Sequence, residues 1–167
     1  MADPAPNFFE VLQVLRKNKV EFIVVGGICA VLHGAPVSTF DIDIVHSQHP
    51  SNIDKLLVAL KDLDARYREH EPKKLFPSAE NLAKKGHHLL MTKAGPLDIL
   101  GRVTKERGYE DLIKHSSEFI ISEEVRIQVL DLEMLITLKE ETGYEKDRAV
   151  LPLLRDTLEE KKNKSLE

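Results

Sequence analysis

Two aspartates, Asp41 and Asp43, are separated by one residue within the apolar segment FDIDIV. Side chains alternate between the two faces of a strand, so carboxylates at positions i and i+2 project from the same face. The same alternation directs Phe40, Ile42 and Ile44 into the core. Neighbouring carboxylates repel one another unless a hard divalent cation lies between them, and Mg²⁺ accepts such oxygens together with substrate phosphates. The pattern therefore predicts a magnesium site on a strand; an ordinary acidic, solvent-facing strand is the alternative.

A glycine pair and a third aspartate extend this pattern. Gly26 and Gly27 follow the apolar segment VEFIVV and precede a short helix, and glycine lets a phosphate approach the backbone closely. Asp98 lies in the otherwise apolar segment PLDIL, where a carboxylate needs a cation or hydrogen-bond partners. A site shared with Asp41 and Asp43 would supply that cation. The alternatives are a tight turn at the glycines and a water-facing edge strand at Asp98.

The elements that must position these residues alternate along the chain. Apolar spacing predicts helices over about 7–18, 28–34, 52–63, 108–115, 131–142 and 145–162. It predicts strands over about 20–25, 40–45, 88–92, 97–100, 119–121 and 125–129, with a polar, irregular segment over 64–87. This order predicts an α+β fold, a mixed β-sheet flanked by helices, with C-terminal helices. We expect one domain over 1–160, with a core of about 20–130 and a tail over 161–167.

Composition excludes several classes of protein. The 167 residues are 42% hydrophobic and 31% charged with a net charge of −4, which suits one globular domain and argues against a protein that coats DNA. The sequence lacks the run of about 20 apolar residues that spans a bilayer, and it does not begin with a secretory leader pattern. Its single cysteine, Cys29, cannot form an internal disulfide. We therefore expect a cytoplasmic protein with no membrane contact.

The order strand, Gly-Gly, helix, Asp-x-Asp strand and later Asp strand resembles the DNA polymerase β-like nucleotidyltransferase superfamily. The segment VVGGICAVLHGAPVSTFDIDIV is similar to the small bacterial nucleotidyltransferases of the AbiEii/MenT-related kind. The matching positions are Gly26, Gly27, Ala30, His33, Gly34, Pro36, Thr39, Asp41 and Asp43. The segments LITLK and GYEKD near the C-terminus show a weaker similarity to the pattern of the same family. Two positions depart from it: Val37 and Tyr144 replace arginines, which would be natural contacts for a triphosphate.

The resemblance implies Mg²⁺-dependent transfer of a nucleoside monophosphate from an NTP, such as ATP, to a hydroxyl of an RNA, protein or small molecule. Two Mg²⁺ ions would be held by Asp41, Asp43 and Asp98, and Asp98 would assist deprotonation of the acceptor. The implied phosphate contacts are Gly26, Gly27, Thr39, Lys139 and Lys146. For each lysine, a solvated helix face is the alternative. A second hypothesis is a catalytically weak or inactive module of the same fold that binds a protein partner, such as a toxin–antitoxin component. A homodimer is also compatible with the sequence.

The segment 66–93 is locally basic, with seven lysines and arginines against three glutamates. The basic residues are Arg66, Arg68, Lys73, Lys74, Lys84, Lys85 and Lys93. Such a patch beside the strand of Asp98 could receive a phosphate-bearing acceptor such as RNA. A mobile, soluble loop is the alternative.

Overall fold

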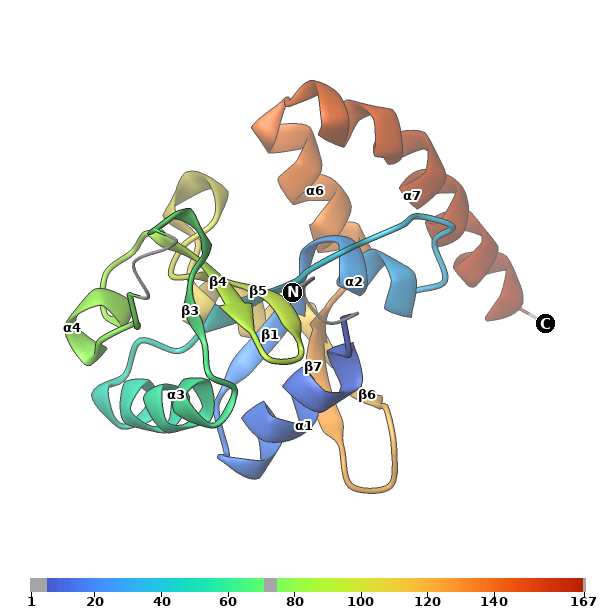
Figure 1. Cartoon of the computed structure of the whole chain (residues 1–167). Coiled ribbons are helices and arrows are strands. Elements are labelled where there is room, and N and C mark those ends of the chain that lie inside the picture. Colours follow the sequence, from blue (N-terminus) through green and yellow to red (C-terminus); the bar gives the residue numbers. More distant parts are fainter. Residues whose placement is uncertain (1–5, 71–74, 167) are drawn as a thin grey trace.

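The computed structural model describes residues 6–70 and 75–166, which fold around one seven-stranded mixed sheet (Figure 1). The strand order is β3-β4-β5-β2-β1-β7-β6. In the centre, β1 (Phe22–Val25) is antiparallel to β2 (Ile42–His46) and parallel to β7 (Arg126–Leu130), while β2 is parallel to β5 (Gly95–Leu100). β4 (His87–Thr92) is antiparallel to β5 and to β3 (Arg66–Tyr67), which forms one edge of the sheet. β6 (Ser116–Ile120) is antiparallel to β7 and forms the other edge.

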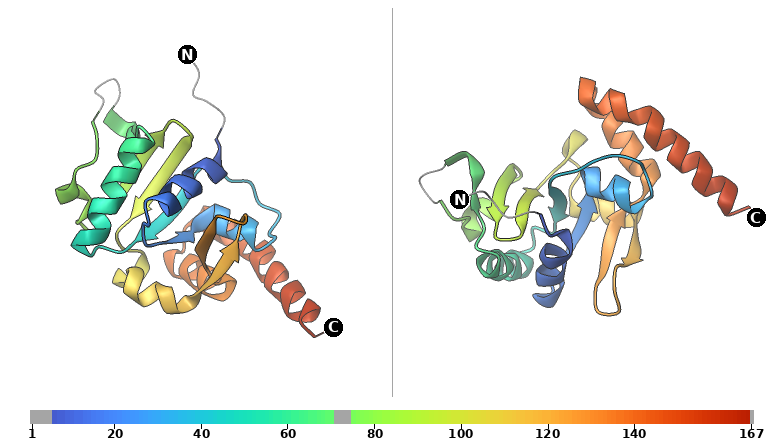
Figure 2. Two further views of the ribbon diagram at one scale, coloured as in Figure 1. Left: turned by 90° about the horizontal axis from the view of Figure 1, so that it is seen from below. Right: turned by 45° about the vertical axis from the view of Figure 1, so that its right-hand side comes forward.

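Helices lie on both sides of this sheet. α1 (Phe8–Lys17) and α3 (Pro50–Asp62) lie against one face, as the view from below shows (Figure 2). On the opposite side are α2 (Gly26–Leu32), α6 (Leu132–Thr142) and α7 (Glu145–Lys164) (Figure 1). The short helices are α4 (Ala79–Leu82), α5 (Tyr109–Leu112) and the 3-10 turns η1 (Arg68–His70), η2 (Thr104–Glu106) and η3 (Ile113–His115).

The core extends over both sides of the sheet, with one part against α1 and α3 and the other against α2, α6 and α7. Ile42, Ile44 and Ile99 of the central strands are fully buried, as are Val11 and Leu15 of α1. Burying such side chains contributes about 1.5–3 kcal/mol each. This packing makes the central strands rigid and leaves part of the opposite face of the sheet available for a site. No helix in 6–70 or 75–166 is long and apolar enough to cross a membrane.

The predicted α+β class, with a mixed sheet and C-terminal helices, is confirmed. The prediction for Phe40 was wrong. Phe40 does not enter the core but is 78% exposed, because β2 begins at Ile42 and the strand alternation does not extend back into the preceding loop. The predicted helix over 28–34 begins earlier, at Gly26, so the glycine pair forms its first turn.

The segment 64–87 is also more regular than predicted. β3 pairs with β4, η1 follows it, and α4 begins after Ser78, whose hydroxyl accepts a hydrogen bond from the Asn81 N–H at 3.2 Å. Polar composition concealed these elements because a two-residue edge strand and a four-residue helix carry little hydrophobic periodicity. Two of the predicted basic residues, Lys73 and Lys74, lie outside the described residues.

Candidate active site

Three carboxylates converge where β2 and β5 run side by side. The parallel register places Asp43 directly opposite Asp98, so the two side chains project from the same face of the sheet. Asp41 lies two residues before Asp43, just ahead of the strand. One oxygen from each of the three carboxylates lies within 4.8 Å of the others. That spacing would let the three oxygens share one hard divalent cation.

Burial and mutual repulsion perturb this cluster. Burial, together with the charges of Asp41 and Asp98, raises the pKa of Asp43 from an ordinary 3.8 to about 7. Burial and the charge of Asp98 also raise the pKa of Asp41, while Arg68 acts in the opposite direction. Near neutral pH the cluster therefore resists carrying its full negative charge unless a cation joins it.

The chemistry of this donor set fits Mg²⁺. Asp98 is 9% exposed, and its Oδ1 accepts no hydrogen bond from the described residues. Arg68 Nη1 lies 2.8 Å from this oxygen but donates to the Leu90 carbonyl oxygen, also at 2.8 Å. Asp98 Oδ1 therefore has an ion-pair partner but no hydrogen-bond donor among the described residues, and the all-oxygen donor set of the three carboxylates suits Mg²⁺ rather than a softer metal.

The glycine pair packs directly against the carboxylates. Gly26 has φ +68°, and a Cβ there would lie 2.0 Å from Asp43 Oδ2. A Cβ at Gly27 would lie 2.8 Å from Thr39 Oγ1. The Thr39 hydroxyl donates to the Asp41 carbonyl oxygen at 3.0 Å and so holds the loop that leads into the cluster. Glycine is required at position 26 both for its backbone conformation and for the space that the carboxylate fills.

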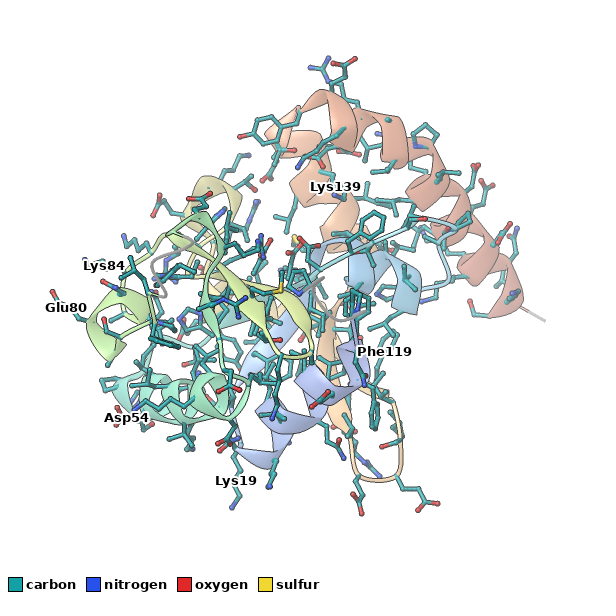
Figure 3. All side chains as sticks on the ribbon, in the orientation of Figure 1. Lys19, Asp54, Glu80, Lys84, Phe119 and Lys139 are labelled. Atoms are coloured by element: carbon teal, nitrogen blue, oxygen red, sulfur yellow. The ribbon has the colours of Figure 1, made fainter. Side chains whose placement is uncertain are left out.

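Two helices bring the predicted lysines to the same region. Lys139 lies on α6, above the sheet (Figure 3), and its Nζ is 3.1 Å from Asp147 Oδ1. Thr142 Oγ1 donates to Asp147 Oδ2 at 2.5 Å, and Gly143, with φ 64°, reverses the chain between α6 and α7. The buried Asp147 therefore fixes the position of Lys139, whereas Lys146, at the start of α7, is exposed.

All eight residues predicted from the sequence line one cavity of about 540 Å³, namely Gly26, Gly27, Thr39, Asp41, Asp43, Asp98, Lys139 and Lys146. A second hollow of about 530 Å³ shares Asp43 and both lysines with it and extends over β5 toward Lys85 and Arg102. The two positions that lack the expected arginines also line these spaces: Val37 lines the first and Tyr144 the second. The structure therefore brings the predicted residues together without assigning them a role.

Sequence reasoning missed two residues of this region. Asp147 belongs to the segment GYEKD, whose similarity to the family pattern could have pointed to it. Its ion pair with Lys139, however, depends on the turn between α6 and α7. Arg68 was predicted as part of a basic surface, yet it points at the carboxylates. Another member of that surface, Lys85, lines the second hollow, whereas Lys84 is exposed at the outer side of the molecule, beside α4 (Figure 3).

Comparison with known proteins identifies the fold. No protein-family model matches the chain, and no curated protein matches its sequence. The lincomycin-bound structure of the lincosamide antibiotic adenylyltransferase LnuA is similar with a TM-score of 0.59, covering 90% of this chain and 95% of LnuA at 17% identity. This chain has the nucleotidyltransferase fold. TM1012 of Thermotoga maritima, described as a candidate nucleotidyltransferase, gives a TM-score of 0.49 at 22% identity, over 95% of this chain and 89% of its own.

Proposed function

We propose that this protein is an enzyme, a nucleotidyltransferase that moves a nucleoside monophosphate from an NTP to a hydroxyl group. The observation that carries the proposal is the cluster of three carboxylates on adjacent strands, in a cavity that the glycine pair and two lysines also line. The fold shared with the adenylyltransferase LnuA supports the same class of reaction.

In this proposal Asp41, Asp43 and Asp98 hold Mg²⁺, with two ions in the complete site. Bound Mg²⁺ supplies positive charge that neutralises the phosphates and lowers the pKa of an acceptor hydroxyl. The protein's own contribution is to position the reactants. Gly26 and Gly27 line the cavity and would contact phosphate oxygens through their backbone, and Asp98 would accept the proton of the acceptor hydroxyl.

The remaining phosphate contacts would come from Thr39, Lys139 and Lys146. Asp147 holds Lys139 in place, so this ammonium group is ordered before a nucleotide arrives. Lys146 is exposed and also lines the cavity, so its side chain is accessible to a bound phosphate. Because Val37 and Tyr144 supply no guanidinium, the triphosphate would be neutralised by lysines and by the metal rather than by bidentate arginines.

We propose further that the protein belongs with the AbiEii/MenT-related nucleotidyltransferases, forms one domain over 1–160 and acts in the cytoplasm. ATP is one candidate donor. The acceptor would be an RNA, a protein or a small molecule, the last of these because LnuA is a lincosamide adenylyltransferase. A homodimer or a toxin–antitoxin partner would be the relevant assembly.

The second candidate function is a catalytically weak or inactive module that binds a protein partner. The valine and the tyrosine at the two arginine positions favour it, because both line the spaces that phosphates would fill. In this alternative the carboxylate cluster is retained without turnover, and the chain should be recovered in a complex.

Thermal unfolding with each of the four NTPs, with and without Mg²⁺, distinguishes the two functions. An enzyme of this kind should gain several degrees in Tm from its donor in the presence of Mg²⁺, since a ligand at 100 times its Kd adds about 2.7 kcal/mol to the stability. The gain should vanish in Asp43→Asn and persist in Asp54→Asn, an exposed control on α3. If no nucleotide shifts Tm, the enzyme is rejected, and co-purification of a partner then tests the binding module.

A further inference from the structure

Arg68 reaches the carboxylate cluster from an edge of the sheet. It begins η1, directly after β3, and its Nη1 lies 2.8 Å from both Asp98 Oδ1 and the Leu90 carbonyl oxygen. The Arg68 side chain is 27% exposed and that of Asp98 is 13% exposed, so both groups are largely removed from water. The hydrogen bond to the β4 backbone holds the guanidinium, so its place beside Asp98 does not depend on the ion pair alone.

This guanidinium is a permanent charge at a place where a metal would bind. Among the ion pairs of residues 6–70 and 75–166, the contact with Asp98 is the one that involves the carboxylate cluster. An arginine side chain does not release its proton in proteins, so its positive charge remains when a metal ion binds nearby. A cation that ligates Asp98 would therefore meet a second positive charge beside the same carboxylate.

We propose that Arg68 is a positioning residue that acts as the resident counter-ion of Asp98 and weakens metal binding to the nucleotide-free protein. The proposal rests on the proposed function, because it assigns Asp98 to a metal site. A metal ion and the guanidinium compete for the charge of one carboxylate until a triphosphate adds negative charge for both. Mg²⁺ would then be held firmly together with the nucleotide and only weakly before it.

A titration of the metal-free, full-length protein with Mn²⁺ tests this proposal without relying on turnover. Arg68→Gln should bind Mn²⁺ about tenfold more tightly than wild type, because one unit of opposing charge is removed a few ångströms from the ion. Arg68→Lys keeps the charge and should stay close to wild type. The matched control is Arg126→Gln, which breaks an exposed ion pair with Glu118 between β6 and β7.

A second titration, in the presence of a nucleotide, tests the competition between the metal ion and the guanidinium directly. Adding the NTP that gives the largest Tm shift should tighten Mn²⁺ binding more in wild type than in Arg68→Gln, because the variant has already lost the competing charge. A purely structural role would lower the Tm of Arg68→Gln and leave its Mn²⁺ affinity unchanged.

Two kinds of failure are distinguishable. If wild type binds Mn²⁺, Asp43→Asn does not, and Arg68→Gln binds it no more tightly than wild type, the counter-ion role is overturned while the metal site stands. If neither wild type nor Arg68→Gln binds Mn²⁺, with or without an NTP, the metal site fails, and with it both the proposed function and the role of Arg68.

Discussion

Replacing Asp43 with asparagine should stabilise the metal-free protein above neutral pH. Burial and the charges of Asp41 and Asp98 raise the pKa of Asp43 from 3.8 to about 7. At about 1.4 kcal/mol per pKa unit, keeping this carboxylate ionised costs the folded state up to about 4 kcal/mol at pH 8. Because the pKa of the neighbouring Asp41 is raised as well and the two groups share the repulsion, we expect the isosteric amide to recover about 2–4 kcal/mol.

Urea unfolding in EDTA between pH 4 and pH 8.5 measures this contribution. The pKa is raised in the folded state, so the stability associated with Asp43 is fully present below pH 3.8 and is lost as the pH rises through about 7. Wild type should therefore lose stability along this interval relative to Asp43→Asn. Burial lowers the pKa values of His46 and His88, which makes their contribution fall as the pH drops below 6.5. Both proteins carry these histidines, so the difference between the two curves reports Asp43 and its interaction with the neighbouring carboxylates.

The control for this experiment is Asp54→Asn, which removes an exposed carboxylate on α3 (Figure 3) and should follow wild type at every pH. Adding Mg²⁺ at pH 8 should stabilise wild type and leave Asp43→Asn unchanged. If Asp43→Asn is less stable than wild type at pH 8 in EDTA, carboxylate repulsion does not govern this cluster and the electrostatic reasoning is refuted.

Three further substitutions test the surroundings of the cluster. Gly26→Ala combines an unfavourable φ of +68° with a distance of 2.0 Å between the new Cβ and Asp43 Oδ2, so it should lower the free energy of unfolding by about 1–3 kcal/mol and abolish the Mg²⁺–NTP shift in Tm. The control Gly34→Ala, with φ +93° and open space around the new Cβ, should lower the free energy of unfolding less and keep the shift. Asp98→Asn should lower kcat by at least about 10³-fold in a pyrophosphate-release assay, with the folded state retained. Asp147→Asn frees Lys139 from its ion pair and should raise the KM for the NTP about tenfold with little change in kcat.

The sequence predicted the site residues best where their positions depend only on neighbouring residues in the chain. Asp41 and Asp43 share a face because of strand geometry, and Gly26 follows a buried strand, so short-range rules were sufficient to select them. The same rules failed at Phe40, because alternation says nothing about the residue at which a strand begins. A short loop before β2 turned this side chain into solvent.

What could not be predicted depends on pairing between distant segments. Asp98 was predicted for the site, but its position directly opposite Asp43 depends on β5 lying between β2 and β4, an order that no local pattern in the sequence encodes. Arg68 reaches Asp98 because β3 adds to the far side of β4 and η1 then turns the chain back over it. Only the fold shows which of the seven basic residues of segment 66–93 contacts the carboxylate cluster, namely Arg68.

The register between β2 and β5 also weighs against an ordinary acidic surface strand. Like charges directly opposite one another destabilise a sheet, and Asp43 faces Asp98 across a parallel pair in which Asp98 is buried. A solvent-facing strand would gain nothing from this arrangement and would lose stability with each carboxylate that ionises. The pair is tolerable because Arg68 offsets part of the charge, and the proposed divalent cation would offset the rest. A cluster that is destabilising on its own and would be stabilised by a bound cation is consistent with the proposed metal-dependent chemistry.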